Sequence, residues 1–137
     1  MLDDKIYEKI QNLCEIGDEL AEGEQYGKAI DKYTKAVKLI PEPKYIYEAS
    51  TWVYTAIGDS FYLAEDFENA LDNFNQALKC EGGLGNPFIV LRIGECFYEL
   101  DNIERAKYFL LQAYMIEGED VFSEEDEKYF KLIGDMI

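Results

Sequence analysis

Four short motifs place a carboxylate at a regular spacing along the chain. Each motif is Ile-Gly followed by an acid, and the acids are Asp18, Asp59, Glu95 and Asp135. The motif glycines stand 36 to 41 residues apart, a spacing typical of stacked-repeat proteins. Carboxylates repeated in this way could pair with arginine or lysine, or serve as acid and base in catalysis. We expect them to form a ladder of negative charge along one face of the folded protein.

The rest of the composition limits the reactions and ligands that these carboxylates could serve. Histidine is absent, which removes the commonest general base and the commonest metal ligand. The cysteines Cys14, Cys80 and Cys96 are odd in number and lack the spacing of a zinc site, so we expect reduced thiols in the cytoplasm. We therefore predict that the protein is not an enzyme and holds no metal or cofactor. The acids are then either a binding surface or ordinary solvated helix faces.

Net charge limits the class of partner. The 137 residues include 29 acids and 13 bases, which gives a formal charge of −16. Such a field repels nucleic acid and anionic membranes, so we predict neither as a partner. The N-terminus lacks the basic and apolar stretches of a signal peptide, and no apolar run is long enough to cross a bilayer. A basic protein or peptide is the partner that this field would attract.

Helical periodicity continues through the whole chain. Apolar residues recur at three- and four-residue steps, as in Ile6, Ile10 and Leu13, and proline or glycine separates the segments. The pattern predicts about seven helices in one domain. We expect that domain to span residues 1–137, with repeats at about 10–43, 51–84 and 87–120 and a capping helix at 123–137.

Several local details belong to this prediction. Residues 44–50 are expected to lengthen the first helix of the second repeat, because Tyr47, Tyr54 and Phe61 recur at heptad spacing. Ser123 is expected to cap the last helix. The isoleucine and glycine of each motif are assigned to packing. Each glycine should face the neighbourhood of an alanine of the next helix, in the pairs Gly17 and Ala29, Gly58 and Ala70, and Gly94 and Ala106.

These positions resemble the tetratricopeptide repeat. That family has a large residue, Leu-Gly and an aromatic residue in its first helix, then alanine, an aromatic and alanine in its second, and a closing proline. The first repeat carries the whole pattern, in Leu13, Ile16, Gly17, Leu20, Ala29, Tyr33, Ala36 and Pro41. The second and third repeats match it with Gly82 and Gly118 in place of proline. The resemblance implies an all-α, right-handed α-solenoid of antiparallel helix pairs that works by binding protein.

The resemblance also implies where a partner would bind. In the family the first helix of each repeat lines a concave groove, and the residue after the motif glycine faces it. The residues implied to contact a partner are Asp18, Glu22, Trp52, Asp59, Tyr62, Phe88, Glu95, Tyr98 and Asp135. A guanidinium or ammonium group would stack on Trp52, Tyr62 or Tyr98 while pairing with a carboxylate. Trp52 is expected at the surface because Tyr54 takes the core position.

One groove type of the family fits poorly. Members that clamp the C-terminal carboxylate of a partner use lysine, asparagine and arginine at groove positions. Here those positions hold Cys14, Asp18, Thr55, Ala56, Phe88 and Arg92. Only Arg92 fits, so a carboxylate clamp is disfavoured.

We therefore predict a protein-interaction module that binds a basic protein or peptide in an acidic, aromatic groove. A chain of this kind resembles a stand-alone bacterial inhibitor, such as an immunity protein that neutralises a basic toxin. A secretion-type chaperone and a general adaptor are the alternatives, and an enzyme is less favoured. The oligomeric state and the identity of the partner stay open.

Overall fold

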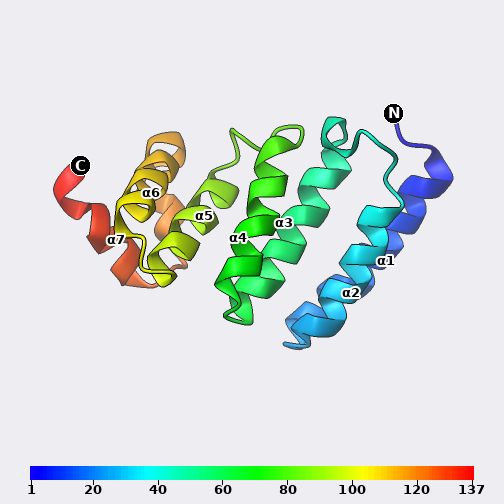
Figure 1. Ribbon diagram of the computed structural model, residues 1–137, viewed down its shortest axis with the longest axis horizontal. Coiled ribbons are helices and arrows are strands. Elements are labelled where there is room, and N and C mark those ends of the chain that lie inside the picture. Colours follow the sequence, from blue (N-terminus) through cyan, green and yellow to red (C-terminus); the bar gives the residue numbers. More distant parts are fainter.

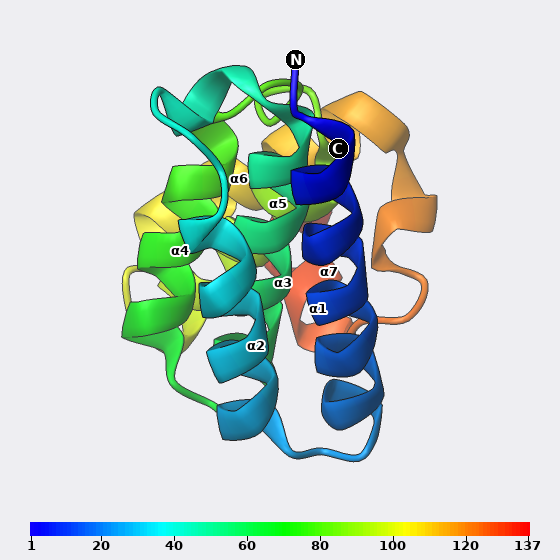
Figure 2. The same cartoon turned by 90° about the vertical axis from the view of Figure 1, so that its right-hand side faces the viewer.

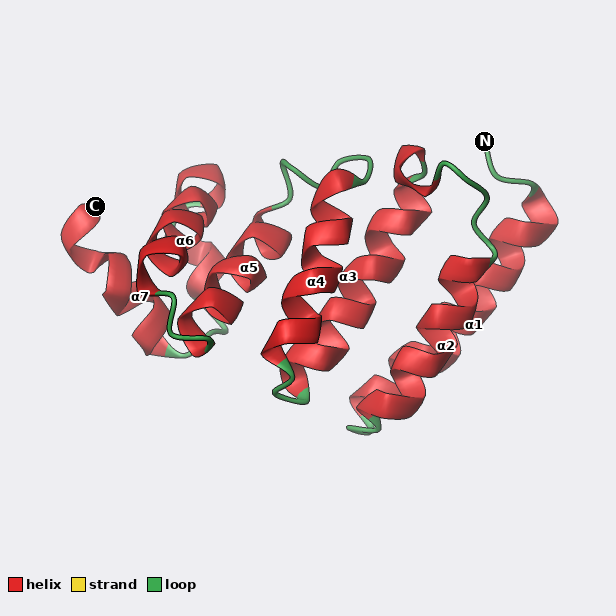
Figure 3. Ribbon diagram, in the orientation of Figure 1, coloured by secondary structure: helices red, strands yellow, loops and turns green.

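The computed structural model describes residues 1–137, which form helices, turns and loops with no strand (Figure 3). None of the helices has the length and apolarity needed to cross a membrane. The predicted all-α fold and the number of helices are confirmed. The seven α-helices are α1 Asp4–Glu22, α2 Tyr26–Lys38, α3 Glu48–Leu63, α4 Phe67–Lys79, α5 Pro87–Glu99, α6 Ile103–Glu117 and α7 Glu127–Ile133.

The helices pair in sequence, and the pairs stack side by side from the N-terminus to the C-terminus (Figure 1). In the view along the stack, α2, α4 and α6 form one layer, and α1, α3 and α7 lie on the other side (Figure 2). The most extensive contacts join α1 to α2, α3 to α4 and α5 to α6 within pairs, with α2 to α3 and α4 to α5 between pairs. We call the surface formed by α1, α3, α5 and α7 the odd-helix face.

The three helix pairs are closed by the same tight turn. Glu24, Glu65 and Asp101 each adopt a left-handed φ of 60 to 64°, which is uncommon for residues other than glycine. The next backbone N–H in each turn donates at 2.8 Å to a carbonyl five residues back, in the pairs Gln25 and Leu20, Asp66 and Phe61, and Asn102 and Phe97. Because the turn repeats, equivalent positions of successive pairs recur on the same face.

Three motif glycines allow close helix packing, but their partners differ from the expected ones. The pairs are Gly17 with Tyr33, Gly58 with Phe74, and Gly94 with Leu110. A methyl group added at any of these glycines would lie 2.6 to 2.9 Å from the partner side chain, well inside van der Waals contact. The predicted partners Ala29, Ala70 and Ala106 lie one turn away on the second helix. The glycines therefore face the predicted part of the second helix, but a large side chain one turn from the alanine fills the space left by the missing Cβ.

Two motif residues do not pack as predicted. Ile57, Ile93 and Ile133 are buried, whereas Ile16 is 45% exposed, because α1 packs chiefly on α2 and leaves its opposite side open. Gly134 lies beyond α7 in the 3-10 turn Gly134–Met136, and no atom lies within 4 Å of a Cβ placed there. The packing explanation of the motif is therefore wrong at Ile16 and at Gly134.

The first helix of the second repeat is shorter than expected. Residues 44–50 do not extend it, because Lys44–Ile46 form a 3-10 turn and Tyr47 is extended, with φ −103° and ψ 130°. The helix begins at Glu48. The Ser50 hydroxyl donates to the carbonyl of Lys44 at 2.6 Å, which ties the turn to the new helix.

The last helix is also shorter than expected. Ser123 does not cap it; the carboxylate of Asp126 does, by accepting from the backbone N–H of Lys128 at 3.0 Å. The 3-10 turn Glu119–Phe122 precedes this cap. The expected capping helix at 123–137 is therefore the seven-residue α7, and the residues before it form a separate acidic segment.

Candidate functional site

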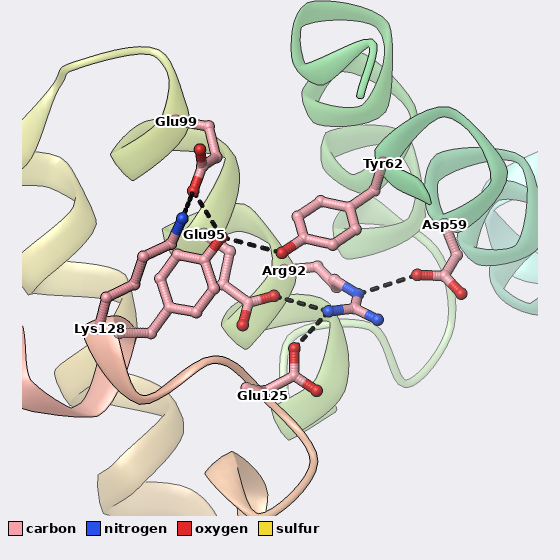
Figure 4. Close-up of polar contacts among 8 residues, drawn as sticks. Asp59, Tyr62, Arg92, Glu95, Glu99, Glu125 and Lys128 are labelled. Carbon is pink, nitrogen blue, oxygen red and sulfur yellow. Dashed lines mark hydrogen bonds and ion pairs between the residues drawn. The ribbon is translucent and has the colours of Figure 1, made fainter. Parts of the chain in front are cut away.

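Arg92 stands at the centre of a carboxylate cluster on the odd-helix face (Figure 4). Its Nε donates to Asp59 of α3 at 2.9 Å, and its Nη1 donates to Glu95 of α5 at 2.7 Å. The same Nη1 pairs with Glu125, from the segment before α7, at 2.5 Å. The Tyr62 ring centre lies 4.2 Å from the guanidinium carbon, in a cation–π contact. One buried arginine therefore joins three parts of the chain.

The charges in this cluster do not balance if every acid is ionised. Glu95 is fully buried, and its Oε2 has no hydrogen-bond partner. Burial raises the pKa of Glu95 to about 9, with Glu125 adding to the shift and Arg92 opposing it. The surroundings of Glu95 therefore favour its protonated form. Burial alone would lower the pKa of Arg92, but the neighbouring carboxylates raise it.

A second network joins α3, α5 and α7 beside the first. The Tyr62 and Tyr129 hydroxyls lie 3.0 Å apart, and the Tyr129 hydroxyl donates to Glu99 at 2.6 Å. Lys128 pairs with the same Glu99 at 2.9 Å. The Tyr98 ring packs edge-on against Tyr129, and the Lys128 ammonium lies 5.4 Å from the centre of the Tyr98 ring. Burial and the bond to Glu99 raise the pKa of Tyr129, so its hydroxyl stays a donor.

We call the end of α3 from Asp59 onward, together with α5 and α7, the C-terminal half of the odd-helix face, and α1 with the start of α3 the N-terminal half. The C-terminal half already contains the cations that a partner was expected to supply. Phe88 also contacts Arg92, with its ring centre 4.8 Å from the guanidinium carbon. Phe88, Tyr62 and Tyr98 thus each face a cation of the chain itself. Glu95 is a correction, because a fully buried carboxyl cannot contact a partner in this conformation. The roles of the other predicted contact residues stay predictions.

The acids nearer the two ends have different surroundings. Asp18 is exposed and accepts a hydrogen bond from the Tyr33 hydroxyl at 2.6 Å. Glu22 is exposed at the end of α1, and Asp135 is exposed in the turn after α7. The two motif acids between them are held by Arg92. The expected ladder of free carboxylates is therefore interrupted in its middle.

The N-terminal helix is the part of the odd-helix face that keeps its charge. α1 contains six acids and two lysines, and none of them takes part in any of the seven ion pairs of the structure. Three of those ion pairs involve Arg92. Acids without an ion pair thus lie along the whole of α1, outside the Arg92 cluster.

An apolar cleft of about 560 Å³ lies between the start of α1 and the start of α3. Trp52 is 43% exposed on its wall, which confirms the predicted surface position. The Tyr7 ring meets Trp52 edge-on, with ring centres 6.1 Å apart. Asp4 and Glu48 bring carboxylates to the same cleft. Its apolar lining comes from Met1, Leu2, Tyr7, Ile46, Tyr47, Ala49 and Trp52.

Glu125 was not among the predicted contact residues. The sequence did, however, contain one indication of a buried ion pair. Arg92 and Glu95 stand three residues apart inside the apolar run 89–97, and charged residues in such a run indicate a buried pair. The other two acids of the cluster could not be found in this way. Asp59 and Glu125 each lie 33 residues from Arg92, and no local spacing connects them.

The architecture defines an all-α helical-repeat protein. The C-terminal TPR-containing domain of a putative FK506-binding protein from Plasmodium falciparum superposes with TM-score 0.78 at 16% identity, covering 99% of this chain and 93% of that chain. The TPR domain of Arabidopsis OM64 gives TM-score 0.76 at 20% identity, covering 96% and 99%. The Yersinia enterocolitica type III secretion chaperone SycD, in complex with a peptide of the translocator YopD, gives 0.75 at 12% identity, covering 94% and 92%.

The chain therefore has the tetratricopeptide repeat fold that its sequence predicted. No protein-family model matches the sequence, and no curated protein matches it significantly. The likeness is one of fold, and function has to be argued from the surfaces described above.

Proposed function

We propose that the protein is an interaction module that binds a basic segment of a partner protein across α1 and α3. One observation carries this proposal. Trp52 lies exposed in an apolar cleft beside a helix whose acids have no intramolecular ion pair. The cleft can take an apolar side chain, and the carboxylates around it can take the cations that flank that side chain.

The α1 acids and the cleft at Trp52 are expected to contribute differently to the free energy of binding. Exposed ion pairs contribute about 0 to 1 kcal/mol each, so the α1 acids alone would not hold a partner. A cation stacked on Trp52, or an apolar side chain seated beside it, would supply most of the affinity. The net charge of −16 would mainly accelerate association with a basic partner and make it salt-dependent.

The structural neighbours support an interaction role. The SycD structure contains a bound peptide of the translocator YopD, so a chain of this fold and size can hold a peptide. The C-terminal half of the odd-helix face is a weaker candidate here, because Arg92 and Lys128 already occupy its acids and rings. Binding across α1 and α3 therefore agrees best with the geometry.

Two biological settings follow from this surface. We propose a stand-alone inhibitor in the cytoplasm, such as an immunity protein that neutralises a basic toxin. A secretion-type chaperone is the second candidate, and the apolar cleft favours it because unfolded export substrates expose apolar side chains. An inhibitor would bind one folded basic protein, whereas a chaperone would bind an extended segment of it. We propose no catalytic activity.

Trp52 allows a direct test, because it is the only tryptophan in the chain. The probe is a short peptide of alternating leucine and arginine, titrated while the tryptophan emission is recorded. We expect a blue shift on binding and an affinity that falls steeply as salt rises. A peptide with glutamate in place of arginine is the matched control and should not bind. Equal binding of both peptides, or unchanged emission, would contradict the proposal.

Calorimetry with variants locates the binding surface. Trp52→Ala should weaken binding of the arginine peptide about tenfold or more, since exposed aromatic anchors dominate such interfaces. Asp4→Asn combined with Glu48→Gln should weaken it less and reduce its salt dependence. Tyr108→Ala removes an exposed aromatic side chain from α6, 59% exposed against 43% for Trp52, and should leave binding unchanged.

A further inference from the structure

The outward side of α6 carries an apolar stripe. Tyr108 is 59% exposed and Met115 is 68% exposed, and the half-buried Leu111 lies between them. Steps of three and four residues place the three side chains on one side of the helix. That side is opposite the fully buried residues of α6, which are Ala106, Leu110 and Ala113.

The other two helices of the same layer have polar residues at the equivalent positions. The alignment rests on the buried alanines Ala29, Ala70 and Ala106, which open the packed side of each helix. At the positions of the stripe, α2 has Asp31, Thr34 and Lys38, and α4 has Asp72, Asn75 and Lys79. The apolar stripe is thus particular to α6 and is not a requirement of the repeat.

The stripe is not explained by packing within the chain. α7 is seven residues long and covers one flank of α6, where Tyr114 meets Phe130 with ring centres 6.3 Å apart. Tyr108 and Met115 remain exposed beyond that contact. An exposed apolar stripe on a strongly charged protein is unfavourable in water unless another surface covers it.

We propose that the stripe pairs with α6 of a second copy of this chain, in an antiparallel arrangement. A two-fold axis between Leu111 and Gln112 would place Tyr108 opposite Met115 of the second copy, and the reverse, as an isologous interface requires. Thioether sulfur and an aromatic ring form a favourable contact. The stripe is therefore complementary to itself in shape and chemistry.

The charges at the two ends of α6 favour the same arrangement. Arg105 and Lys107 balance Asp101 and Glu104 at its start and in the preceding turn. Its end and the following turn carry only acids, namely Glu117, Glu119 and Asp120. An antiparallel pair would place the neutral start of one helix against the acidic end of the other, whereas a parallel pair would align the two acidic ends.

Salt should act on this pairing in the opposite direction from its action on the proposed peptide binding. Two copies each carry −16, so they repel at low ionic strength, and screening removes that repulsion. The apolar contact itself does not weaken with salt. One helix pair buries less than the 1,200 Å² or so of a stable standard interface, so we expect a weak, concentration-dependent dimer.

Sedimentation velocity over a concentration series tests the proposal. At about 500 mM salt, where the Debye length is only a few ångströms, the protein should shift from monomer to dimer as concentration rises. At about 50 mM salt the shift should need a much higher concentration. The double variant Tyr108→Asp, Met115→Asp places like charges opposite each other across the two-fold axis and should weaken dimerisation more than tenfold. Leu84→Ser, which changes a 76% exposed leucine elsewhere, is the matched control and should dimerise like the parent.

Orientation can be tested with a thiol near the two-fold axis. In the antiparallel pair, Gln112→Cys should form a disulfide-linked dimer on mild oxidation, and adding Tyr108→Asp should suppress it. The native thiols interfere little: burial raises the pKa of Cys14 to about 11, with Asp18 adding to it, and Cys80 and Cys96 are buried.

A monomer under all conditions would overturn the proposal, as would a dimer that the Tyr108→Asp, Met115→Asp variant leaves intact. Circular dichroism checks that the variants are folded. The double variant should still bind the arginine peptide, so failure of this pairing and failure of the proposed peptide binding are distinguishable.

Discussion

In the N-terminal half of the odd-helix face, Trp52 and the α1 carboxylates meet solvent, whereas in the C-terminal half Tyr62 and Tyr98 are already covered by cations of the chain. Both halves use aromatic rings and acids at corresponding repeat positions. The difference is that Arg92 and Lys128 supply the positive charge in one half, and nothing supplies it in the other. The same arrangement of rings and acids thus stabilises the fold at one end and is available to a partner at the other.

The largest expected effect is the loss of Arg92. Arg92→Met should lower the free energy of unfolding by about 3 kcal/mol, because Asp59 and Glu125 would be left without their cation. We expect the lower end of the range for broken buried pairs, since Asp59 keeps some contact with water. Urea denaturation measures the change, with the exposed Arg105→Met as control. Equal stability of the two variants would erase the proposed difference between the halves.

Adding a methyl group at a motif glycine should destabilise the C-terminal half more than the N-terminal half, because the atoms around Gly94 have less room to move. Gly94→Ala should cost about 2 kcal/mol, within the range for overpacked cores, because the new Cβ would lie 3.0 Å from the backbone nitrogen of Leu110. Gly17→Ala should cost less, since only the ring of Tyr33 has to move. Gly134→Ala meets no atom within 4 Å and serves as the control. Thermal unfolding ranks the three variants, and a cost at Gly134 equal to that at Gly94 would contradict the packing argument.

The protonated carboxyl predicts a pH dependence that belongs to the C-terminal half. Glu95 has a folded-state pKa of about 9, above the model-peptide value of 4.5, so the folded state binds the extra proton between these values. Stability should therefore fall as pH rises from about 5 to about 9, by more than about 1.4 kcal/mol, the equivalent of one pKa unit. Glu95→Gln keeps a neutral side chain and should flatten this slope. Urea titrations at several pH values test it, and an unchanged slope in the variant would show that Glu95 is ionised.

The smallest expected effect lies in the N-terminal half. Tyr33→Phe removes the hydrogen bond to Asp18 and should cost about 1 kcal/mol. It should leave binding of the arginine peptide unchanged or slightly stronger, because Asp18 becomes free to pair with a cation. Chemical denaturation and calorimetry on the same variant give both values. A stability loss as large as that of Arg92→Met would mean that the N-terminal acids are structural too.

The fold could be predicted from the sequence because its determinants are local. The motif glycines, the alanines of the second helices and their large neighbours recur within each repeat, so periodicity alone locates the helix pairs. The surface position of Trp52 was predicted correctly, but the fully buried Val53, and not the half-buried Tyr54, takes the core position beside it.

The Arg92 cluster could not be predicted in the same way. Its acids come from α3, α5 and the segment before α7, and which of several nearby carboxylates reaches one guanidinium depends on side-chain geometry. The predicted helix across residues 44–50 was wrong for a related reason. A heptad of aromatic residues fits a continuous helix, but a 3-10 turn tied by Ser50 replaces it.

The ion pairs of Arg92 also affect how the protein unfolds. In a repeat array each unit contacts only its neighbours, so the ends can open one unit at a time. Arg92 adds links across 33 residues on either side, which couple α3, α5 and the segment before α7. We expect these elements to unfold as a single cooperative block, with slow and uniform amide hydrogen exchange. The α1–α2 hairpin lies outside that block, so its amides should exchange first, and the α1 side of the proposed binding surface would open more readily than the α3 side.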